Sequence, residues 1–441
     1  MFFKKIITLI GAVCLCAQIS FADSTQNTKT NVEKSSLAPE QQIPDQDVER
    51  LARAVDAIQR YYIKPVSDST LLADAIRGMV SHLDPHSSFL DKEDLDELQT
   101  TVSGEFVGIG VELTTEKGLL KVISPIDGSP AAKAGMKPGD YIIKINNKLV
   151  QDMSLRDAIN RIKGKIGTPV TLTILRKGEN KPLNLVVMRE KVQMHAVTSK
   201  MLAPGYAYIR VALFQGQVAP EVRAAIEKLK VQSGGKLSGL VLDLRGNPGG
   251  LLDASADVVD LFLDDTSKYK NLIVYTKGRV KTSDVSFYAH AGDIIKGVPI
   301  VVLINGGSAS ASEITAGALQ DYQRAIIMGT RSFGKGSVQT VIPIGPHSAI
   351  KLTTALYYTP AGREIQARGI EPNVIVPEMS VNDKKTSGGL DLDEANYDDH
   401  IKNHDAAAEE KSDKKEDATL AKDDYQLYQA LMMLQGMHAM R

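Results

Sequence analysis

The feature that most constrains this chain is a buried strand that leads through a glycine turn directly into a helix. Val298–Ile304 is a short, apolar, β-branched run, which predicts a buried strand. Asn305–Gly307 predicts a turn, and a helix with small residues opens from Ser308. Ser310 is therefore expected at a helix N-terminus, where free backbone N–H groups point outward. Such groups beside a hydroxyl suit acyl transfer, because they can hold the oxyanion that forms after attack.

A serine hydroxyl is a poor nucleophile until a base takes its proton. Lys335 lies between two glycines, 25 positions after Ser310 and behind a second strand-like run at 325–328. A lysine can be that base only when it is neutral, which burial among apolar groups favours by lowering its pKa. Taken alone, such a serine is more often a helix cap and such a lysine a solvated loop cation.

Strands alternate with helices around this stretch, which implies a largely parallel sheet with crossover helices. The expected strands are 206–211, 240–244, 272–275 and 298–304, and the expected helices are 220–229 and 253–263. In such sheets the chemistry gathers at the carboxyl ends of the strands. Gly246–Gly250 follows one of these ends, where a glycine-rich turn lets backbone N–H groups approach a ligand. A tight turn without a ligand is the alternative.

The chain begins with a segment typical of a secretory signal peptide. Residues 1–22 contain two lysines, an apolar run too short to span a bilayer comfortably, and small residues at a cleavage position. Both cysteines, Cys14 and Cys16, lie inside this segment, so the mature protein would have neither a disulfide nor a thiol nucleophile. A lipid anchor at Cys16 and an uncleaved anchor are the alternatives. Residues 23–45 are rich in polar residues and predict a disordered linker.

Two smaller modules precede the sheet. Residues 46–103 show helical spacing of apolar positions and predict a small helical module. Residues 104–190 resemble a PDZ domain, chiefly through the run SPAAKAGMKPGDYIIKINN. In a PDZ domain an extended peptide adds to a sheet edge, and the N–H groups of a glycine loop capture its terminal carboxylate. The expected loop residues are Phe106, Val107, Gly108, Ile109 and Gly110.

The C-terminal part changes character again. Residues 378–423 are charged and repetitive, which predicts a solvated, disordered segment. Residues 424–441 form an amphipathic helix with Leu427, Ala430, Leu431 and Leu434 on one face. Such a helix docks either on a partner or on its own domain, and the sequence does not decide between them. The net charge of −1 gives no argument for nucleic acid or an acidic membrane surface.

Three motifs in a fixed order connect these modules to a known family. LDLRGNPGG, NGGSASASEI and GTRSFGKGSVQ follow the signal peptide, the helical module and the PDZ-like domain. The whole arrangement, over roughly residues 47–377, resembles the carboxy-terminal processing (tail-specific) proteases. The resemblance implies a multidomain α/β (α+β) protein: a helical N-terminal module, a β-rich PDZ-like domain, and a crotonase-like α/β serine protease core with a mixed sheet at 191–377.

The resemblance also assigns roles to individual residues. Ser310 matches the nucleophile of the family, Lys335 its general base, and Gln339 the glutamine that orients the lysine. The backbone N–H of Ala311 and one from Gly249 or Gly250 would form the oxyanion hole, and the sequence leaves the choice of glycine open. Family members are gated by the PDZ domain, and Arg176 is the expected coupling residue.

The expected function is therefore that of a serine endopeptidase in the periplasm, with association with the inner membrane as a further option. Its substrates would be proteins with accessible, apolar C-terminal tails, and a homo-oligomer and an adaptor protein are expected partners. No metal or organic cofactor is implied.

Three other interpretations fit parts of this sequence. Gly329–Lys335 approaches the phosphate-binding pattern GxxxxGK, but residue 336 is glycine instead of the Ser or Thr that would hold magnesium. Ser332–Lys335 spells SxxK, although the glycines beside Lys335 oppose the helix turn that this motif needs. His290 or His347 could serve as a base. A fourth possibility belongs to another class, a PDZ scaffold that binds tails without cutting them.

Overall fold

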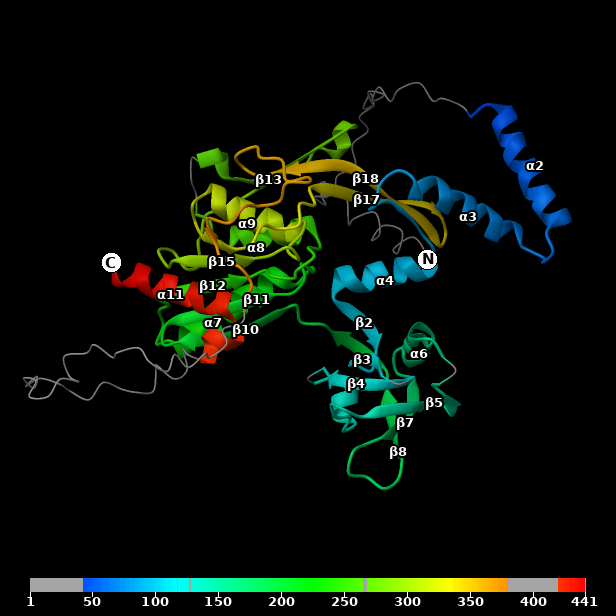
Figure 1. Ribbon diagram of the computed structural model, residues 1–441, viewed down its shortest axis with the longest axis horizontal. Coiled ribbons are helices and arrows are strands. Elements are labelled where there is room, and N and C mark those ends of the chain that lie inside the picture. Colours follow the sequence, from blue (N-terminus) through cyan, green and yellow to red (C-terminus); the bar gives the residue numbers. More distant parts are fainter. Residues whose placement is uncertain are drawn as a thin grey trace, which may run out of the picture. The chain divides into compact units, whose positions relative to one another are not determined.

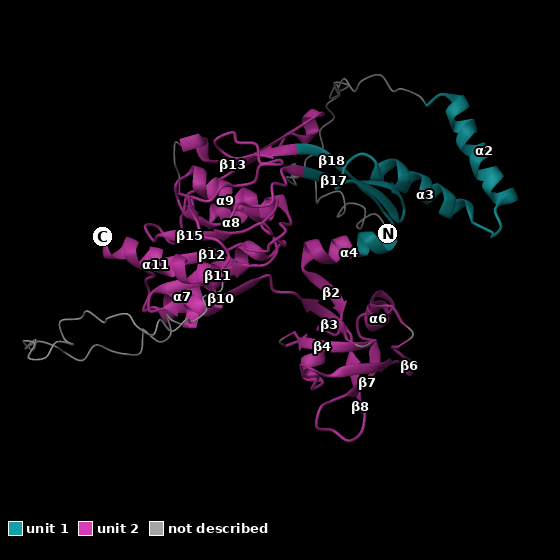
Figure 2. Cartoon of the chain, in the orientation of Figure 1, with its two compact units in different colours: residues 1–96, 338–355 teal, residues 97–337, 356–441 magenta. Residues whose placement is uncertain are grey.

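The computed structural model describes residues 43–116, 118–126, 128–151, 153–264, 268–379 and 419–440. The predicted signal peptide (1–22) lies outside these residues, as do nearly all of the predicted linker and most of the charged segment 378–423. The chain divides into two compact units, which Figure 2 colours separately. One unit, called unit 1 here, holds the residues up to Asp96 together with Val338–Ala355, and unit 2 holds the rest. Within the described ranges, no helix has the length and apolar character that a membrane crossing requires.

Unit 1 combines helices from the N-terminal part with strands from much later in the chain. Its elements are α2 (Asp45–Tyr61), α3 (Asp68–Ser81), β1 (Ser88–Leu90), the start of α4 (Lys92–Ser103), and most of β17 (Ser337–Gly345) and β18 (Ser348–Tyr358). β1 pairs antiparallel with β18, with Phe89 opposite Ile350. The helices expected in this module are present, but the module is completed by strands that its own sequence does not contain (Figure 2, teal).

The segment that resembles a PDZ domain folds around a small β-sheet in unit 2. The sheet has the order β3-β4-β5-β7-β8, with β6 beside β5, so β3 forms one edge. The packed interior contains Ile142, Leu172 and Ile174, all with no exposed surface. The elements are β2 (Glu105–Gly108), β3 (Val111–Glu116), β4 (Leu119–Pro125), α5 (Pro130–Lys133), β5 (Tyr141–Ile145), β6 (Lys148–Leu149), α6 (Leu155–Ile162), β7 (Pro169–Leu175), β8 (Leu183–Met188) and β9 (Glu190–Gln193).

A second sheet of unit 2 forms the core that carries Ser310. Its order is β10-β11-β12-β15-β16-β19, and all neighbours are parallel except β10 and β11. The expected mixed sheet is therefore confirmed. Its strands are β10 (Val197–Ala203), β11 (Tyr206–Val211), β12 (Gly239–Asp243), β15 (Ile300–Ile304), β16 (Ile326–Gly329) and β19 (Val374–Ile375). β12 and β15 are buried along their whole length, which is why both are continuous apolar runs in the sequence.

Helices cover the core sheet, and Figure 1 shows α8 and α9 on one side of β12 and β15 and α11 on the other. The helices that cover the sheet are α7 (Val218–Gln232), α8 (Leu252–Asp260), α9 (Ala311–Asp321) and α11 (Tyr425–Ala439). The remaining elements are β13 (Leu272–Gly278), β14 (Ser286–Tyr288), and the 3-10 turns η1 (Lys268–Asn271) and η2 (Lys281–Ser283).

The C-terminal helix α11 docks on its own core domain, which settles the choice that the sequence left open. Its four predicted face residues, including Leu427 and Leu434, are buried against Val241, Val301 and Leu303 of the sheet. Asp424 caps the start of the helix, and its carboxylate accepts a hydrogen bond from the backbone N–H of Leu427 (3.0 Å).

A partly buried ion pair fastens the start of α11 to the turn after β12. Arg245 donates to both carboxylate oxygens of Asp424, at 2.8 and 2.6 Å, and to those of Asp243. Such two-pronged contacts fix orientation as well as distance. Because Arg245 directly precedes Gly246–Gly250, the C-terminal helix is attached to the glycine turn itself.

Candidate active site

Three turns meet at the carboxyl edge of the core sheet. The strand register places Asp243 beside Leu303 and Ile304 beside Gly329, so β12, β15 and β16 end side by side. Hydrogen bonds then join the turns that follow. The N–H of Ala309 donates to the carbonyl of Asn247 (3.0 Å), and the N–H of Phe333 to that of Ser308 (3.0 Å). The three sequence motifs therefore form one site at the edge where a parallel sheet is expected to carry its chemistry.

Ser310 occupies a strained position at the head of α9. Its backbone has φ 53° and ψ −114°, a conformation that residues other than glycine rarely adopt. Such strain costs about 1–3 kcal/mol and persists only where the surroundings enforce it. The side chain is partly exposed while Ala309 and Ala311 on either side are buried. The junction therefore presents the Ser310 hydroxyl, as a nucleophile on a sharp strand-to-helix turn requires.

Glu313 is the feature that holds this site together. Its side chain has no exposed surface and accepts four hydrogen bonds. One oxygen, Oε2, receives the N–H of Ser310 (2.8 Å) and the N–H of Lys335 (2.9 Å). Two backbone nitrogens bonded to one oxygen lie within about 6 Å of each other, so the serine and lysine segments are brought together.

The other oxygen of Glu313 fixes the lysine loop. Oε1 accepts from the hydroxyl of Ser332 (2.6 Å) and from the N–H of Gly334 (2.7 Å). Burial raises the pKa of Glu313 above its ordinary value, and the four hydrogen bonds act in the opposite direction. The sequence prediction missed this residue. A glutamate three positions after a serine at a helix start is the usual capping-box pattern, which gives no hint of contacts with the loop at 332–335.

Tyr357 is a second residue that the sequence prediction missed. Its hydroxyl donates to the carbonyl of Lys335, and it also hydrogen bonds to the Ser310 side chain. The ring is buried, and burial holds the pKa of the phenol well above its ordinary value, so Tyr357 stays a neutral donor. Ser310, Lys335, Glu313 and Tyr357 thus form one contact network within unit 2, in which Lys335 is partly buried.

The glycine turn packs directly against the serine. A Cβ added to Gly249 would lie 2.8 Å from the Cβ of Ser310 and 3.1 Å from the nitrogen of Ala311, so only glycine fits there. The N–H of Gly249 donates to Oδ1 of Asn247 (2.9 Å). By contrast, the N–H groups of Ala311 and Gly250 have no hydrogen-bond partner within the part of the chain that the structure describes.

Gln339 lies on β17 and belongs to unit 1, whereas Lys335 belongs to unit 2. Its side-chain amide donates to Oγ1 of Thr353 on β18 (3.3 Å). Its orienting role toward the lysine stays a prediction.

The PDZ residues named from the sequence fall in two elements. Phe106, Val107 and Gly108 belong to β2, which pairs with β9 instead of continuing into β3. Ile109 and Gly110 form the turn between β2 and β3, where the carbonyl of Gly110 accepts from the Ser129 hydroxyl (2.9 Å). The expected loop residues therefore comprise the end of a strand and a turn, in which Gly110 has a positive φ of 72°.

Arg176 makes its contacts within the PDZ-like segment. Its guanidinium donates to both carboxylate oxygens of the buried Asp140 at 2.8 Å, and to the carbonyl of Gly135 at 2.7 Å. These bonds give it a structural role, and its predicted coupling to the protease core stays a prediction.

The competing motifs are not supported by the geometry. Gly329–Lys335 is followed by strand β17, whereas a phosphate-binding loop opens a helix. The Ser332 hydroxyl is bonded to Glu313 and accepts the N–H of Ile370 (2.6 Å), so it is engaged in structure. His290 is 86% exposed beside Asp260, and His347 lies exposed in the turn between β17 and β18.

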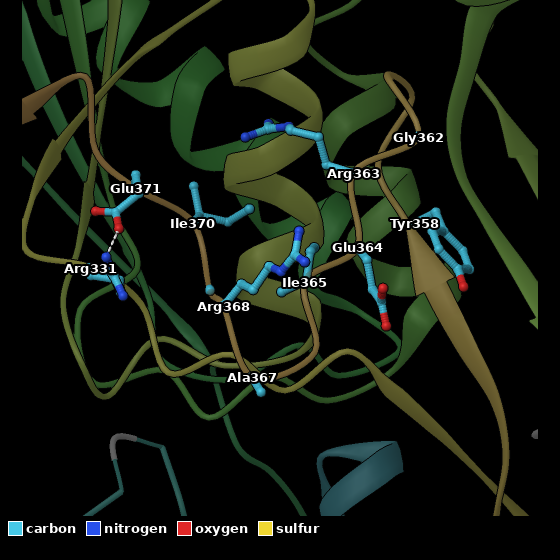
Figure 3. A pocket seen from close by; sticks show the side chains of 11 residues that line it. Arg331, Tyr358, Gly362, Arg363, Glu364, Ile365, Ala367, Arg368, Ile370 and Glu371 are labelled. Atoms are coloured by element: carbon cyan, nitrogen blue, oxygen red, sulfur yellow. Dashed lines mark ion pairs between the residues drawn. The ribbon is translucent and has the colours of Figure 1, made fainter.

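A cavity of about 600 Å³ opens next to the lysine loop. It is lined by Arg331, Tyr358 and residues 362–365 and 367–371, and Figure 3 shows the ion pair between Arg331 and Glu371 at its side. Neither Ser310 nor Lys335 lines it. The cavity is therefore separate from Ser310 and Lys335.

Comparisons with known proteins agree with the resemblance. A family model of peptidase family S41 matches residues 205–376, one of the PDZ domain matches residues 107–187, and one of the activating protease CtpB N-terminal domain matches residues 8–94.

Similar proteins carry related names. A carboxy-terminal-processing protease of Bartonella bacilliformis is 41% identical over 98% of this chain and 96% of its own. The carboxy-terminal processing protease CtpA of Bacillus subtilis is 36% identical over 83% of this chain and 76% of its own. Among solved structures, the photosystem II D1 C-terminal processing protease is 30% identical, with a TM-score of 0.43 over 74% of this chain and 92% of that chain. The chain therefore belongs to peptidase family S41, the carboxy-terminal processing proteases, and is a serine-type peptidase.

Proposed function

We propose that this chain is an endopeptidase in which Ser310 attacks the peptide carbonyl and Lys335 takes its proton. The observation that carries the proposal is the shared carboxylate of Glu313, which binds the backbone N–H groups of both residues through one oxygen. A nucleophile and a base contribute to catalysis only when they are held in register, and this arrangement fixes the two main chains together.

The reaction follows from these groups. Neutral Lys335 accepts the hydroxyl proton as Ser310 bonds to the carbonyl carbon, and the lysine then gives that proton to the leaving amine. Water hydrolyses the acyl-enzyme in the second half of the cycle. Gln339 orients the lysine, a role that rests on its match to the family pattern.

The oxyanion is held by the N–H groups of Ala311 and Gly250. Both N–H groups are unpaired within the described residues, and the first of them begins helix α9, where the backbone dipole favours negative charge. Gly249 contributes by its lack of a side chain, since a Cβ there would meet the serine.

Substrates are selected by their C-terminal tails. The edge strand β3 has only β4 as its neighbour in the sheet, so an extended peptide can pair with its other side. The names of the relatives describe carboxy-terminal processing, which fits this mode of recognition. We place the enzyme in the periplasm because of the signal-like residues 1–22, and we expect a homo-oligomer and an adaptor to contribute to its control.

The test is cleavage of an unstructured protein with an apolar C-terminus, followed by intact mass. Ser310→Ala and Lys335→Ala should abolish cleavage, whereas Lys296→Ala, which removes an exposed lysine of the same unit, should not. Making the terminal residues of the substrate charged should slow cleavage if the PDZ domain selects tails.

Normal turnover by Lys335→Ala would refute the lysine mechanism. Tail binding without any cutting, even after cell-envelope extract is added to supply an adaptor, would favour a scaffold.

A further inference from the structure

The side-chain amide of Gln339 can face in either of two directions, and only one of them suits its proposed role. A side-chain amide carries an acceptor oxygen on one side and a donor NH₂ on the other. To orient a lysine it must present the oxygen, because the lysine nitrogen carries the protons. Some other group must therefore fix which way the amide faces.

The amide of Gln339 is bonded to the hydroxyl of Thr353, with 3.3 Å between Nε2 and Oγ1. A threonine hydroxyl can donate or accept, so by itself it would bind either side of the amide. Its second contact decides the matter. Oγ1 of Thr353 also lies 3.1 Å from Oδ1 of Asp84.

Asp84 is held as an acceptor on every side. The N–H groups of His86 (2.8 Å) and Ser87 (3.0 Å) donate to Oδ1, and the Ser87 hydroxyl donates to Oδ2 (2.6 Å). Burial acts to raise the pKa of Asp84, but the bonds from Ser87, His86 and Thr353 outweigh it and keep the pKa below its ordinary value. An ionised carboxylate accepts and never donates, so the hydroxyl proton of Thr353 must point to Asp84.

The direction of the remaining bonds follows. Because the Thr353 hydroxyl donates its hydrogen bond to Asp84, its lone pairs face Gln339. Only the NH₂ side of the amide can donate a hydrogen bond to these lone pairs. The backbone N–H of Thr353 also donates to the Ser87 hydroxyl (3.1 Å), which ties β18 to the turn after α3. All four residues belong to unit 1.

We propose that Asp84 and Thr353 are positioning residues of the peptidase, which lock the Gln339 amide with its NH₂ group on the threonine and so leave its carbonyl oxygen as the side available for the orienting role. The inference rests on the proposed function, because it gives the orienting role of Gln339 a physical cause. It also assigns a purpose to the N-terminal module, which supplies one end of a hydrogen-bond relay to a residue of the protease motif.

A matched control exists one position along the same strands. Thr340 on β17 and Thr354 on β18 form a hydroxyl pair at 2.6 Å, with the same sequence separation as Gln339 and Thr353. No carboxylate is bonded to that pair within the described residues. Thr354→Val therefore removes a hydroxyl from the same strand without touching the relay.

The experiment measures kcat and KM of the full chain on the unstructured substrate. Thr353→Val should lower kcat about tenfold or more with KM within about twofold, since an orienting group acts in the transition state. Thr353→Ser should restore kcat, Asp84→Ala, which removes the acceptor, should resemble Thr353→Val, and Thr354→Val should match wild type. In a Gln339→Ala background, Thr353→Val should have almost no further effect, because the relay then has nothing to orient.

Each outcome decides one question. Equal kcat for Thr353→Val and wild type would refute the relay while Ser310→Ala remains inactive, so the proposed function would survive. The relay would also be refuted if Thr353→Val lowered kcat as much in the Gln339→Ala background as in wild type, because the two residues would then act independently. If Asp84→Ala fails to fold, the comparison of Thr353→Val with Thr353→Ser still decides, because both variants keep the carboxylate.

Discussion

Replacing Glu313 with glutamine tests how the site is assembled. The variant keeps the shape of the side chain and exchanges one acceptor oxygen for an NH₂ group that only donates. Of the four donors around Glu313, only the Ser332 hydroxyl can turn and accept instead. The amide should therefore place its NH₂ at the Oε1 position, next to Ser332 and Gly334, and keep its oxygen for Ser310 and Lys335.

The expected cost follows from this orientation. The N–H of Gly334 loses its acceptor in a buried site, which costs about 1–3 kcal/mol. The bonds to Ser310 and Lys335 pass from a charged to a neutral acceptor, which loses about 1 kcal/mol each, but the buried charge that burial disfavours is removed as well and offsets this loss. The free energy of unfolding should therefore fall by about 1–3 kcal/mol, the cost at Gly334. Since the two main chains stay tied to one oxygen, kcat should fall only about tenfold, whereas Glu313→Ala should lose at least a hundredfold.

The assay pairs urea unfolding with kcat measured well below the unfolding transition. Asp293→Asn is the control, because it breaks a buried ion pair with Arg324 that lies away from the serine and lysine turns. It should destabilise the protein by a similar amount and leave kcat of the folded enzyme unchanged. Equal stability of Glu313→Gln and wild type would refute the four-bond account. A matching loss of kcat in Asp293→Asn would show that the effect is general.

Three further results are expected. Gly249→Ala should lower kcat about a hundredfold, because its Cβ would lie 2.8 Å from the Cβ of Ser310. Gly246→Ala is the control from the same turn, and it should keep most activity in the same kinetic assay, because the nearest atom there is 3.8 Å away. Arg176→Ala should destabilise the PDZ-like segment by about 3 kcal/mol in thermal unfolding, since it leaves Asp140 buried without its cation, and unchanged stability would refute this. Because burial raises the pKa of Glu313 above 4.5, activity should fall as the pH drops toward 4.5. The folded protein binds that proton more readily than the unfolded chain, so the contribution of Glu313 to the stability of the protein decreases as the pH rises and not as it falls. A melting temperature that fell in parallel with activity at low pH would therefore contradict the account.

The sequence was informative wherever local pattern and site coincide. Ser310 could be placed at a strand-to-helix junction because β15 is a fully buried strand and thus a continuous apolar run. The glycine turn was found in the same way behind β12. The two turns could be expected to lie close together, because the carboxyl ends of parallel strands meet at one edge of the sheet.

Contacts between distant segments could not be predicted in this way. Glu313 forms a capping pattern by itself, and its function depends on a loop about twenty residues further on. The relay is a stronger case, because Asp84 and Thr353 are 269 positions apart in the chain. Strands β17 and β18 complete the N-terminal module, yet nothing in the helical spacing of residues 46–103 indicates that strands are missing. Helical periodicity reports which face is buried, and it does not identify what covers that face.

The docked C-terminal helix sets a limit on when this enzyme can become active. Leu427, Leu431 and Leu434 close one face of the core sheet, and Asp424 holds the arginine that precedes the glycine turn. These residues come after both the glycine turn and Ser310 in the chain. A nascent chain therefore lacks one wall of its core and an anchor of its glycine turn until residues 424–434 have been synthesised. A chain that stops before α11 should therefore remain an inactive protease, because its site is made before the helix that anchors it.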